Sequence, residues 1–345
     1  MKIPAEPGPE DACYLGFDIG GTKCAVVLGC RMACKKAGEQ DPPRVLGRYE
    51  LSTQGVPASE LIQQLISAAR KLIASLPAGL RPRGAGVSCG SPLDSHRGLI
   101  LSPPNLPGWD RVPIVMMLKQ ALNMPVWLLN DADAGALAEW KFGAGQGCSS
   151  MVFLTFGTGF GAGLILNSRL YSGIDDGAGE IGHIRISPTG PVGYGKAGSL
   201  EGFCSGGGIA QLARMRVLEK TQMGQTVSFC EAAGGPEYLT ARIVGDAAVQ
   251  GDPLAKAILA ESGTYLGRGL AILVDLLNPE RIIIGSIFAR CQPWIWPSAA
   301  AVLQAESLER TFRRCRVYPA GLGEQIGDLA ALAIAMEKEK ECQAI

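Results

Sequence analysis

The sequence predicts an α/β protein with two lobes, on the basis of its length, its apolar content and its alternating patterns. Its 345 residues exceed the roughly 250 to 300 that one hydrophobic core usually serves. Hydrophobic residues make up 47% of the chain and charged residues 19%, a composition that excludes intrinsic disorder. Short apolar runs of strand length alternate with amphipathic stretches of period 3.6, which is the pattern of an α/β fold.

The first two predicted strands form a hairpin. Residues 14–18 and 24–28 are apolar runs, joined by a turn that contains Gly20 and Gly21. The remaining predicted strands are apolar runs bounded by glycine, proline or polar residues: 44–51, 84–88, 126–129, 151–156, 162–166, 183–187 and 281–284.

The predicted helices lie between these strands. The clearest covers 60–76, with an apolar stripe along one face and Pro77 after its end. A second begins at Pro253, directly after Asp252, and runs to 277. The others are 114–122, 134–142, 208–220, 240–250, 298–313 and 326–338. Two Pro/Gly-rich segments, 91–111 and 187–208, are predicted to be binding loops.

Charge and composition exclude several classes of protein. Lys and Arg number 32 and Asp and Glu number 32, so the chain lacks the charge excess of a nucleic-acid or membrane-surface binder. Residues 1–11 lack the basic and apolar regions of a signal peptide and are predicted to form a flexible tail. The 11 cysteines are scattered, without a Cys-x-x-Cys pair, and we expect reduced thiols in a cytoplasmic protein.

The first candidate site is the glycine turn of the hairpin, formed by Asp18, Gly20, Gly21, Thr22 and Lys23. Exposed amides beside a carboxylate, a hydroxyl and an ammonium can bind phosphate oxygens and a metal-bound water. The spacing of a Walker A loop is absent, and a strand follows instead of a helix. An ordinary hairpin turn is the alternative interpretation of an isolated Gly–Gly pair.

A second glycine-rich segment contains Thr155, Gly157, Thr158 and Gly159. A dinucleotide-binding fingerprint would need glycine in place of Ala162 and a helix after it, whereas the following residues are strand-like. The segment therefore predicts another strand–turn–strand hairpin, about 140 residues after the first. Two such hairpins could enclose one phosphate chain from opposite sides.

Two sets of polar residues suit a sugar substrate. Asn130 and Asp131 follow a predicted strand, where a carboxylate can act as general base toward an alcohol, although Asn and Asp are also the preferred helix N-caps. Glu180, His183 and Glu201 lie among glycines and offer the donors and acceptors that sugar hydroxyls need. With only 2 histidines in the chain, His183 cannot belong to a multi-histidine metal centre.

In their order along the chain, these motifs resemble those of the ROK-family sugar kinases, from about residue 15 to 336. The resemblance implies the two-lobed, actin-like ATPase fold of hexokinases, with ATP and sugar in the cleft between the lobes. The expected small lobe is 12–129, completed by a C-terminal helix at 325–340, and the expected large lobe is 130–324.

The resemblance also implies a role for each residue. Asp131 would be the catalytic base, and both glycine turns, with Gly285, would bind ATP and its Mg²⁺. Gly285-Ser286 stands where the family usually has two glycines. The residues implied to hold the sugar are Gly90, Asn105, Asn130, Glu180, His183 and Glu201.

The chain departs from the family at the zinc site. Family members usually place three cysteines after the histidine, and these four residues bind a structural zinc. Here Val192, Tyr194 and Ser199 occupy the cysteine positions, which predicts a protein without structural zinc.

The predicted function is therefore ATP-dependent phosphorylation of a hexose or N-acetylhexosamine. The partner would be a small-molecule sugar, with no nucleic acid or membrane, and the family suggests a homodimer. The alternatives are a sugar-sensing regulator of the same family and a catalytically weak sugar-binding protein. A regulator would carry a helix-turn-helix domain before the first glycine turn, where about 17 residues precede Asp18.

Overall fold

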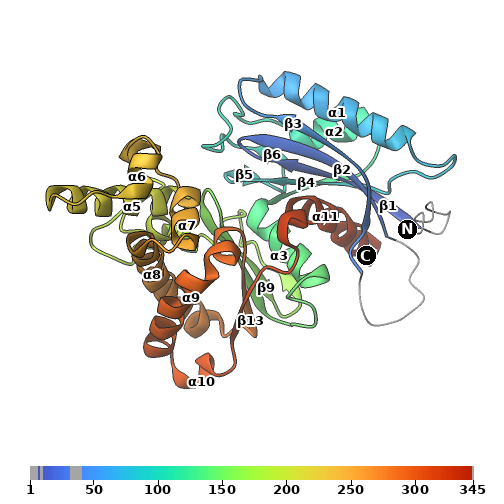
Figure 1. Ribbon diagram of the computed structural model, residues 1–345. Helices are drawn as coiled ribbons and strands as arrows, with labels where there is room; N and C mark the ends of the chain where they lie inside the picture. Colours follow the sequence, from blue (N-terminus) through green and yellow to red (C-terminus); the bar gives the residue numbers. More distant parts are fainter. Residues whose placement is uncertain (1–6, 8–10, 32–40, 344–345) are drawn as a thin grey trace, which may run out of the picture. The chain divides into compact units, whose positions relative to one another are not determined.

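A computed structural model describes residues 7, 11–31 and 41–343, and the chain divides into two compact units (Figure 1). Unit 1 consists of the described residues up to Gln146, the segment Ser172–Ala178, and the described residues from Glu324. Unit 2 consists of Gly147–Tyr171 and Gly179–Gly323. The expected tail at 1–11 lies mostly outside the described residues.

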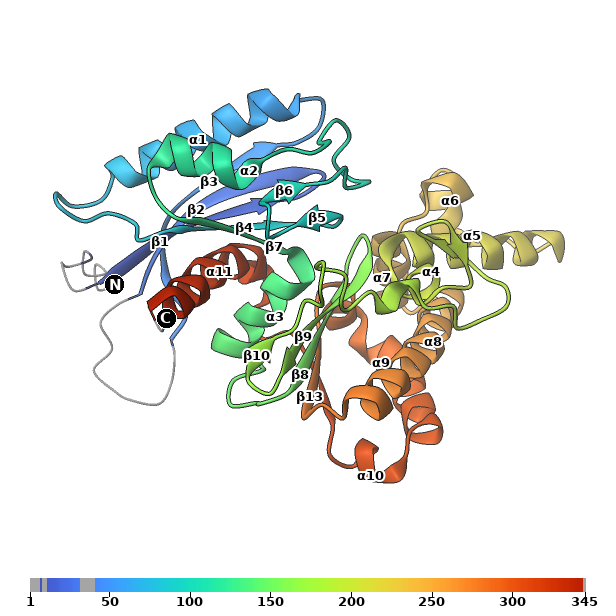
Figure 2. The same ribbon diagram turned by 180° about the vertical axis from the view of Figure 1, so that it is seen from behind.

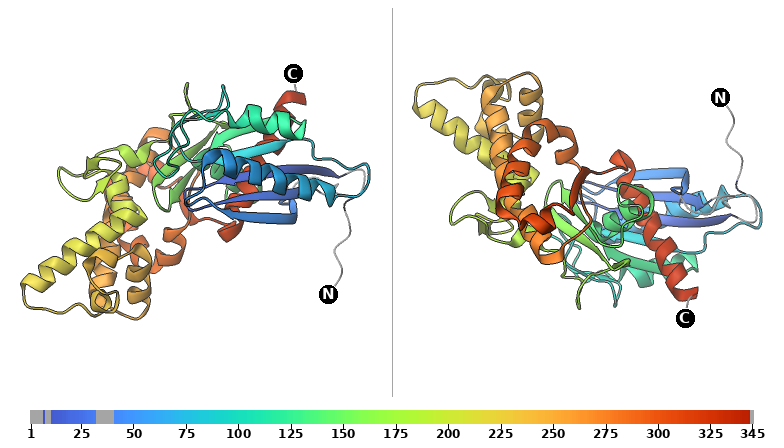
Figure 3. Two further views of the ribbon diagram at one scale, coloured as in Figure 1. Left: turned by 90° about the horizontal axis from the view of Figure 1, so that it is seen from above. Right: turned by 90° about the horizontal axis from the view of Figure 1, so that it is seen from below.

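Unit 1 is a five-stranded sheet with helices on both faces (Figure 3). Helices α1 (Ala58–Ala74) and α2 (Ile114–Leu122) lie side by side over one face, and α3 (Asp131–Phe142) and α11 (Ile326–Gln343) lie under the other. Strand β1 pairs antiparallel with β2 and parallel with β4. The strand order is β3 (Arg44–Ser52), β2 (Lys23–Arg31), β1 (Ala12–Ile19), β4 (Ala85–Cys89) and β7 (Val126–Asn130). Two short strands, β5 (Leu93–Asp94) and β6 (Leu99–Ile100), form a separate hairpin.

The alternation of side chains along β1 explains how α11 joins this sheet. Phe17 is buried in the core shared with α1, whereas Tyr14 packs with Leu332 of α11 on the opposite face. On that second face a Cβ atom at Gly86 would lie 2.1 Å from the carbonyl oxygen of Ala331. Helix α11 therefore lies directly on the strands, and α3 packs beside it. This packing places α3 in unit 1, so the observed unit continues past the expected boundary at 129.

Unit 2 has a sheet of the same topology (Figure 2). Its first hairpin, β8–β9, carries the second glycine turn, as β1–β2 carries the first, and both predicted hairpins are confirmed. Parallel strands continue each sheet beyond the hairpin. The order is β10 (Arg169–Leu170), β9 (Phe160–Leu166), β8 (Met151–Phe156), β13 (Arg281–Ile284) and β14 (Arg316–Pro319).

The helices of unit 2 gather around α8 (Pro253–Leu277) and α9 (Ile287–Glu306), which pack together along their length. Gly263 of α8 makes this contact close, because a Cβ atom there would lie 2.2 Å from the carbonyl oxygen of Ile295. Among the described helices α8 is long and apolar enough to cross a membrane, but 61% of its apolar window is buried, as expected for a core helix. The others are α4 (Leu200–Cys204), α5 (Gly206–Gln222), α6 (Ser228–Ala232), α7 (Ala241–Val249) and α10 (Glu309–Phe312).

Two predicted elements of unit 2 are wrong. The expected strand at 183–187 is absent: His183 ends a 3₁₀ turn, η1 (Ile181–His183), and of the residues that follow only Arg185 pairs, in an isolated bridge with Ser199. The expected helix at 298–313 begins at Ile287, ends at Glu306 and is followed by the separate α10. Helix α9 contains two prolines, Pro293 and Pro297, and it packs closely against α8.

The cysteines also differ from expectation. Cys13 and Cys30 lie directly opposite each other in the β1–β2 register and form a disulfide, so the prediction that all thiols are reduced is wrong for this pair. Both are fully buried. The free thiols among the described residues are Cys24, Cys89, Cys148, Cys204, Cys230, Cys291, Cys315 and Cys342.

Candidate functional site

The first glycine turn lies in unit 1, and a threonine outside the motif fixes its backbone. Within the turn the amide of Gly20 donates to the carbonyl oxygen of Lys23 at 3.1 Å. Thr53, which follows β3, donates from Oγ1 to the oxygen of Gly20 at 2.8 Å and from its amide to the oxygen of Thr22 at 3.0 Å. Sequence reasoning missed Thr53 because one threonine after a strand forms no motif.

The same turn meets the first predicted binding loop. A Cβ atom at Gly21 would lie 2.5 Å from the carbonyl oxygen of Asn105, so only glycine fits there. Gly90, at the end of β4, has open space where a side chain would stand. Unit 1 therefore brings a predicted phosphate-binding residue and a predicted sugar-binding residue into contact.

Three carboxylates and an arginine surround the end of β1. Burial, and then the negative charges of Asp131 and Asp328, raise the pKa of Asp18 to about 6, while Arg48 and Lys23 lower it in part. Asp328, in the first turn of α11, accepts from Nε of Arg48 at 3.0 Å. Neither Arg48 nor Asp328 was predicted, since only the fold brings these positions, 280 residues apart, together.

Asn130 and Asp131 have different roles in the structure. Oδ1 of Asn130 accepts from the amide of Ala132 at 2.8 Å and Nδ2 donates to Oγ of Ser91 at 2.6 Å, so Asn130 is the N-cap of α3. Asp131 follows as the first helical residue, with an exposed side chain at the carboxyl end of the parallel strand β7. Although the residue is accessible to solvent, the protein atoms packed around its carboxyl lower its hydration and raise its pKa, and backbone amides offset part of this increase. A carboxylate with a raised pKa is suited to accept a proton from an alcohol.

The electrostatics of Asp18 lead to a prediction about stability. Because its pKa is raised from 3.8 to about 6, the ionised group opposes folding, and the native state loses stability as pH rises through 6. We expect Asp18→Asn to increase the free energy of unfolding by about 2 kcal/mol near pH 8 and by almost nothing near pH 4. Urea unfolding at both pH values measures this difference. A variant less stable than the parent at pH 8 would contradict the assignment.

The second glycine turn lies in unit 2, between β8 and β9. The amide of Gly157 donates to the oxygen of Gly159 at 3.1 Å, and Oγ1 of Thr155 accepts from the amide of Gly161 at 2.9 Å. The amide of Gly206, the first residue of α5, donates to the oxygen of Gly157 at 2.8 Å. The positive end of the dipole of α5 therefore lies beside the turn, which favours an anion there.

The predicted sugar-binding residues of unit 2 lie next to this turn. Oε2 of Glu201 accepts from the amide of Phe160 at 3.0 Å. Glu180 directly precedes the 3₁₀ turn η1 and His183 is its last residue; the turn packs on β9, and both side chains are exposed. Unit 2 thus brings Glu201 to the second glycine turn, as unit 1 brings Asn105 to the first.

Gly285 also lies close to the second turn. It follows β13, and its amide donates to the oxygen of Leu154 at 3.0 Å. Ser286 has a left-handed φ of 54°, a conformation that glycine adopts without strain. A Cβ atom at Gly157 would lie 3.9 Å from Oγ of Ser286.

The residues at the three cysteine positions hold their loop through ordinary hydrogen bonds. Ser199 is fully buried and caps α4, accepting from the amide of Gly202 at 3.2 Å. Gln211 of α5 bonds both the amide and the carbonyl of Val192 at 2.9 Å. Tyr194 is 67% exposed and contacts the ring of His183 edge-on. Among the residues that the structure describes, no group of three or more metal-ligating side chains could hold an ion.

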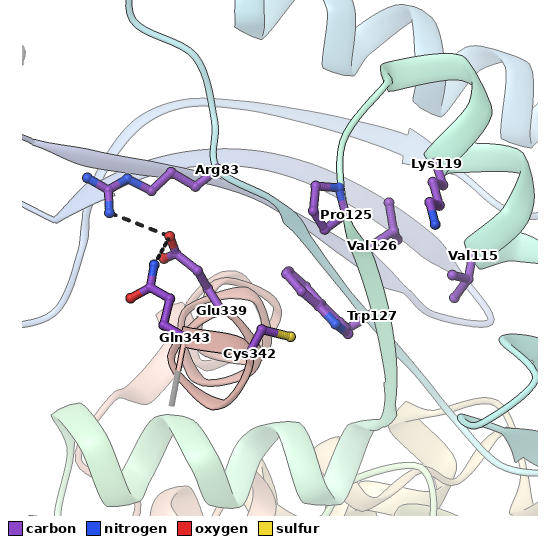
Figure 4. Close-up of a pocket in the computed structure, with 9 residues that line it drawn as sticks. All are labelled: Arg83, Val115, Lys119, Pro125, Val126, Trp127, Glu339, Cys342 and Gln343. Atoms are coloured by element: carbon purple, nitrogen blue, oxygen red, sulfur yellow. Dashed lines mark hydrogen bonds and ion pairs between the residues drawn. The ribbon is translucent and has the colours of Figure 1, made fainter. Parts of the chain in front are cut away.

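A pocket of about 380 Å³ also opens in unit 1, between β7 and α11 (Figure 4). The ring of Trp127 and the thiol of Cys342 face each other across it. None of the predicted site residues lines this pocket. Its walls are Arg83, Val115, Lys119, Pro125, Val126, Trp127, Glu339, Cys342 and Gln343.

Comparisons with known proteins agree with this architecture. The sequence pattern of the ROK family matches residues 14–338. The chain is 29% identical to a glucokinase of Halalkalibacterium halodurans over 97% of its own length and 98% of that protein. It is 34% identical to an N-acetylmannosamine kinase of Escherichia coli over 79% of this chain and 81% of that one. The E. coli transcriptional repressor Mlc is 29% identical over 71% of this chain and 58% of the repressor.

A solved structure supports the same conclusion about the fold. The ROK-family glucokinase of Streptomyces griseus, in complex with glucose and AMPPNP, is 27% identical, with a TM-score of 0.73 over 94% of this chain and all of that one. The actin-like ATPase fold class predicted from the motifs is therefore confirmed.

Proposed function

Because the chain belongs to the ROK family, we propose that it is an ATP-dependent kinase of a hexose or N-acetylhexosamine. The observation that carries this proposal is the exposed carboxylate of Asp131 at the end of β7, in the unit where Asn105 contacts the first glycine turn. The relatives named as glucokinase and N-acetylmannosamine kinase support the substrate class.

In the proposed reaction Asp131 orients a sugar hydroxyl and accepts its proton as the γ-phosphoryl group is transferred. The other sugar hydroxyls are proposed to be held by the open backbone at Gly90 and by the side chains of Asn105, Asn130, Glu180, His183 and Glu201.

The two glycine turns are proposed to bind the phosphates of ATP. Three features suit the turns to phosphate: their glycine amides are not covered by side chains, the carboxylate of Asp18 lies beside the first turn, and the start of α5 lies beside the second. When bound, Mg²⁺ would neutralise phosphate charge. Gly285 is proposed to leave room for the nucleoside.

A sugar-sensing regulator is the second candidate, favoured by the match to the repressor Mlc. Repression alone would not need a general base at position 131. We propose a cytoplasmic enzyme, forming a homodimer, that acts on a free sugar and not on nucleic acid or a membrane.

The decisive experiment measures ADP release with ATP and Mg²⁺ over a panel of sugars. The panel contains glucose, allose, fructose, mannose, N-acetylglucosamine and N-acetylmannosamine. We expect ADP release that depends on at least one of these sugars and on Mg²⁺. Sugar binding by calorimetry without sugar-dependent ADP release would instead support the sensing candidate.

We further propose that the protein folds and works without zinc. Its loop is held by the Ser199 cap and by Gln211, and the nearby thiol of Cys204 is buried with a raised pKa and donates to the oxygen of Ser262. We expect a zinc-selective chelator in excess Mg²⁺ to leave melting temperature and activity unchanged. One zinc per chain by elemental analysis, lost together with activity, would contradict this.

A further inference from the structure

The segment Ser172–Ala178 joins unit 1, although its neighbours in the sequence on both sides belong to unit 2. It forms a closed loop, because the amide of Ala178 donates to the oxygen of Ser172 at 3.0 Å. Glu180, a proposed sugar-binding residue, follows it after one glycine. The segment is therefore a closed loop of unit 1 that precedes a proposed sugar-binding residue in the sequence.

Two side-chain contacts tie the segment to the rest of unit 1. Oγ of Ser172 donates to Oδ2 of the buried Asp133, two residues after Asp131 in α3, at 2.5 Å. At the other end Asp176 accepts two hydrogen bonds from Ser95, one from the amide to Oδ2 and one from the hydroxyl to Oδ1, each at 2.7 Å. Both carboxylate oxygens of Asp176 therefore accept from the same residue, Ser95, in a charge-assisted bidentate contact.

Ser95 lies between β5 and β6, in the loop 91–111 that carries Asn105. The Asp176–Ser95 contact thus joins this loop to the segment that leads to Glu180.

The backbone at Asp176 shows that this contact is maintained against strain. Its φ is +61°, in the left-handed region that costs a residue with a side chain about 1 kcal/mol and glycine almost nothing. Glycine would be the residue of choice if only the turn mattered. Aspartate tolerates this conformation better than most residues with a side chain, and here its carboxylate also holds Ser95.

We propose that Asp176 is a positioning residue for the sugar, which fixes the loop of Asn105 through Ser95. This inference rests on the proposed function. It assigns Asp176 no contact with the reacting atoms. Its effect should appear in sugar binding and not in ATP binding, because the contact involves neither glycine turn.

The test compares Asp176→Gly, Asp176→Asn and Ser95→Ala, with Asp175→Asn as the matched control. Asp175 is the exposed neighbouring carboxylate and makes no contact with Ser95. The glycine variant removes the clamp and also relieves the strained φ, so it should fold at least as well as the parent.

We expect Asp176→Gly to raise KM for the sugar about tenfold or more, with KM for ATP and melting temperature unchanged. Asp176→Asn keeps one acceptor oxygen, so its KM for the sugar should lie between those of the glycine variant and the parent. The double variant Ser95→Ala with Asp176→Gly should have a sugar KM no higher than that of either single variant, because both changes remove the same contact.

The outcomes separate this inference from the proposed function. A parent protein without sugar-dependent ADP release would overturn the function itself. An active parent with the same sugar KM in Asp176→Gly would overturn the positioning role alone. Equal increases in both KM values, together with a lower melting temperature, would also overturn it, because they indicate general damage.

Discussion

Replacing Asp131 with asparagine is expected to lower kcat by about 10²- to 10⁴-fold, the usual contribution of a positioned general base. The fold should survive, since Asn130 caps α3 without the help of Asp131. Sugar binding, measured by calorimetry, should also survive, because asparagine keeps the size of the side chain and one acceptor oxygen.

The pH dependence provides a second readout for Asp131. Its raised pKa means that activity of the parent protein falls as pH decreases through that pKa, when the carboxylate takes up a proton. The residual activity of Asp131→Asn should lack this acidic limb. The control is Asp110→Asn, since Asp110 is an exposed carboxylate of unit 1 that bonds Ser102. Unchanged turnover with native melting in Asp131→Asn would remove this residue from the role of base.

Replacing Gly157 with valine is expected to weaken ATP binding by about 10- to 100-fold, the usual cost of forcing extra methyl groups into an occupied site. The protein itself has room for the change, because the nearest atom to a Cβ there is Oγ of Ser286 at 3.9 Å. The added side chain would therefore lower ATP affinity without lowering the stability of the protein. Sugar affinity and melting temperature should stay near those of the parent.

Gly21→Val is the informative contrast. A Cβ atom at Gly21 would lie 2.5 Å from the backbone of Asn105, so that variant should impair ATP and sugar together. Calorimetry on both variants with both ligands distinguishes the two patterns. Equal losses of ATP and sugar affinity in Gly157→Val would contradict a phosphate role for the second turn.

The sequence predicted those features whose physics is local. Both hairpins, most helices and the places of their glycines follow from patterns within about 20 residues. The capping role of Asn130 was also foreseeable, as an alternative to sugar binding, because its side chain acts on the next residues. The 3₁₀ turn at Ile181–His183 was not, because no local pattern of the sequence marks it.

The residues that support the site could not be predicted in the same way. Several of these residues contact partners that are tens to hundreds of residues away in the sequence, and they belong to no motif: Thr53, Arg48, Asp328 and Gln211. The common topology of the two sheets was hidden for a related reason. Strand order depends on which runs pair, and local sequence patterns do not specify that pairing.

The position of α11 has a consequence for how the protein is made. Strands β1, β4 and β7 leave the ribosome within the first 130 residues, but the helix that covers their second face is synthesised after residue 325. Until then that face, including Tyr14 and Val27, lacks the side chains of Leu332 and Ala335 that bury it. Domains generally fold as units during synthesis, and uncovered apolar surface is prone to aggregation. Unit 2 has its whole sequence available first, and the nascent unit 1 would depend on chaperones until its last helix arrives.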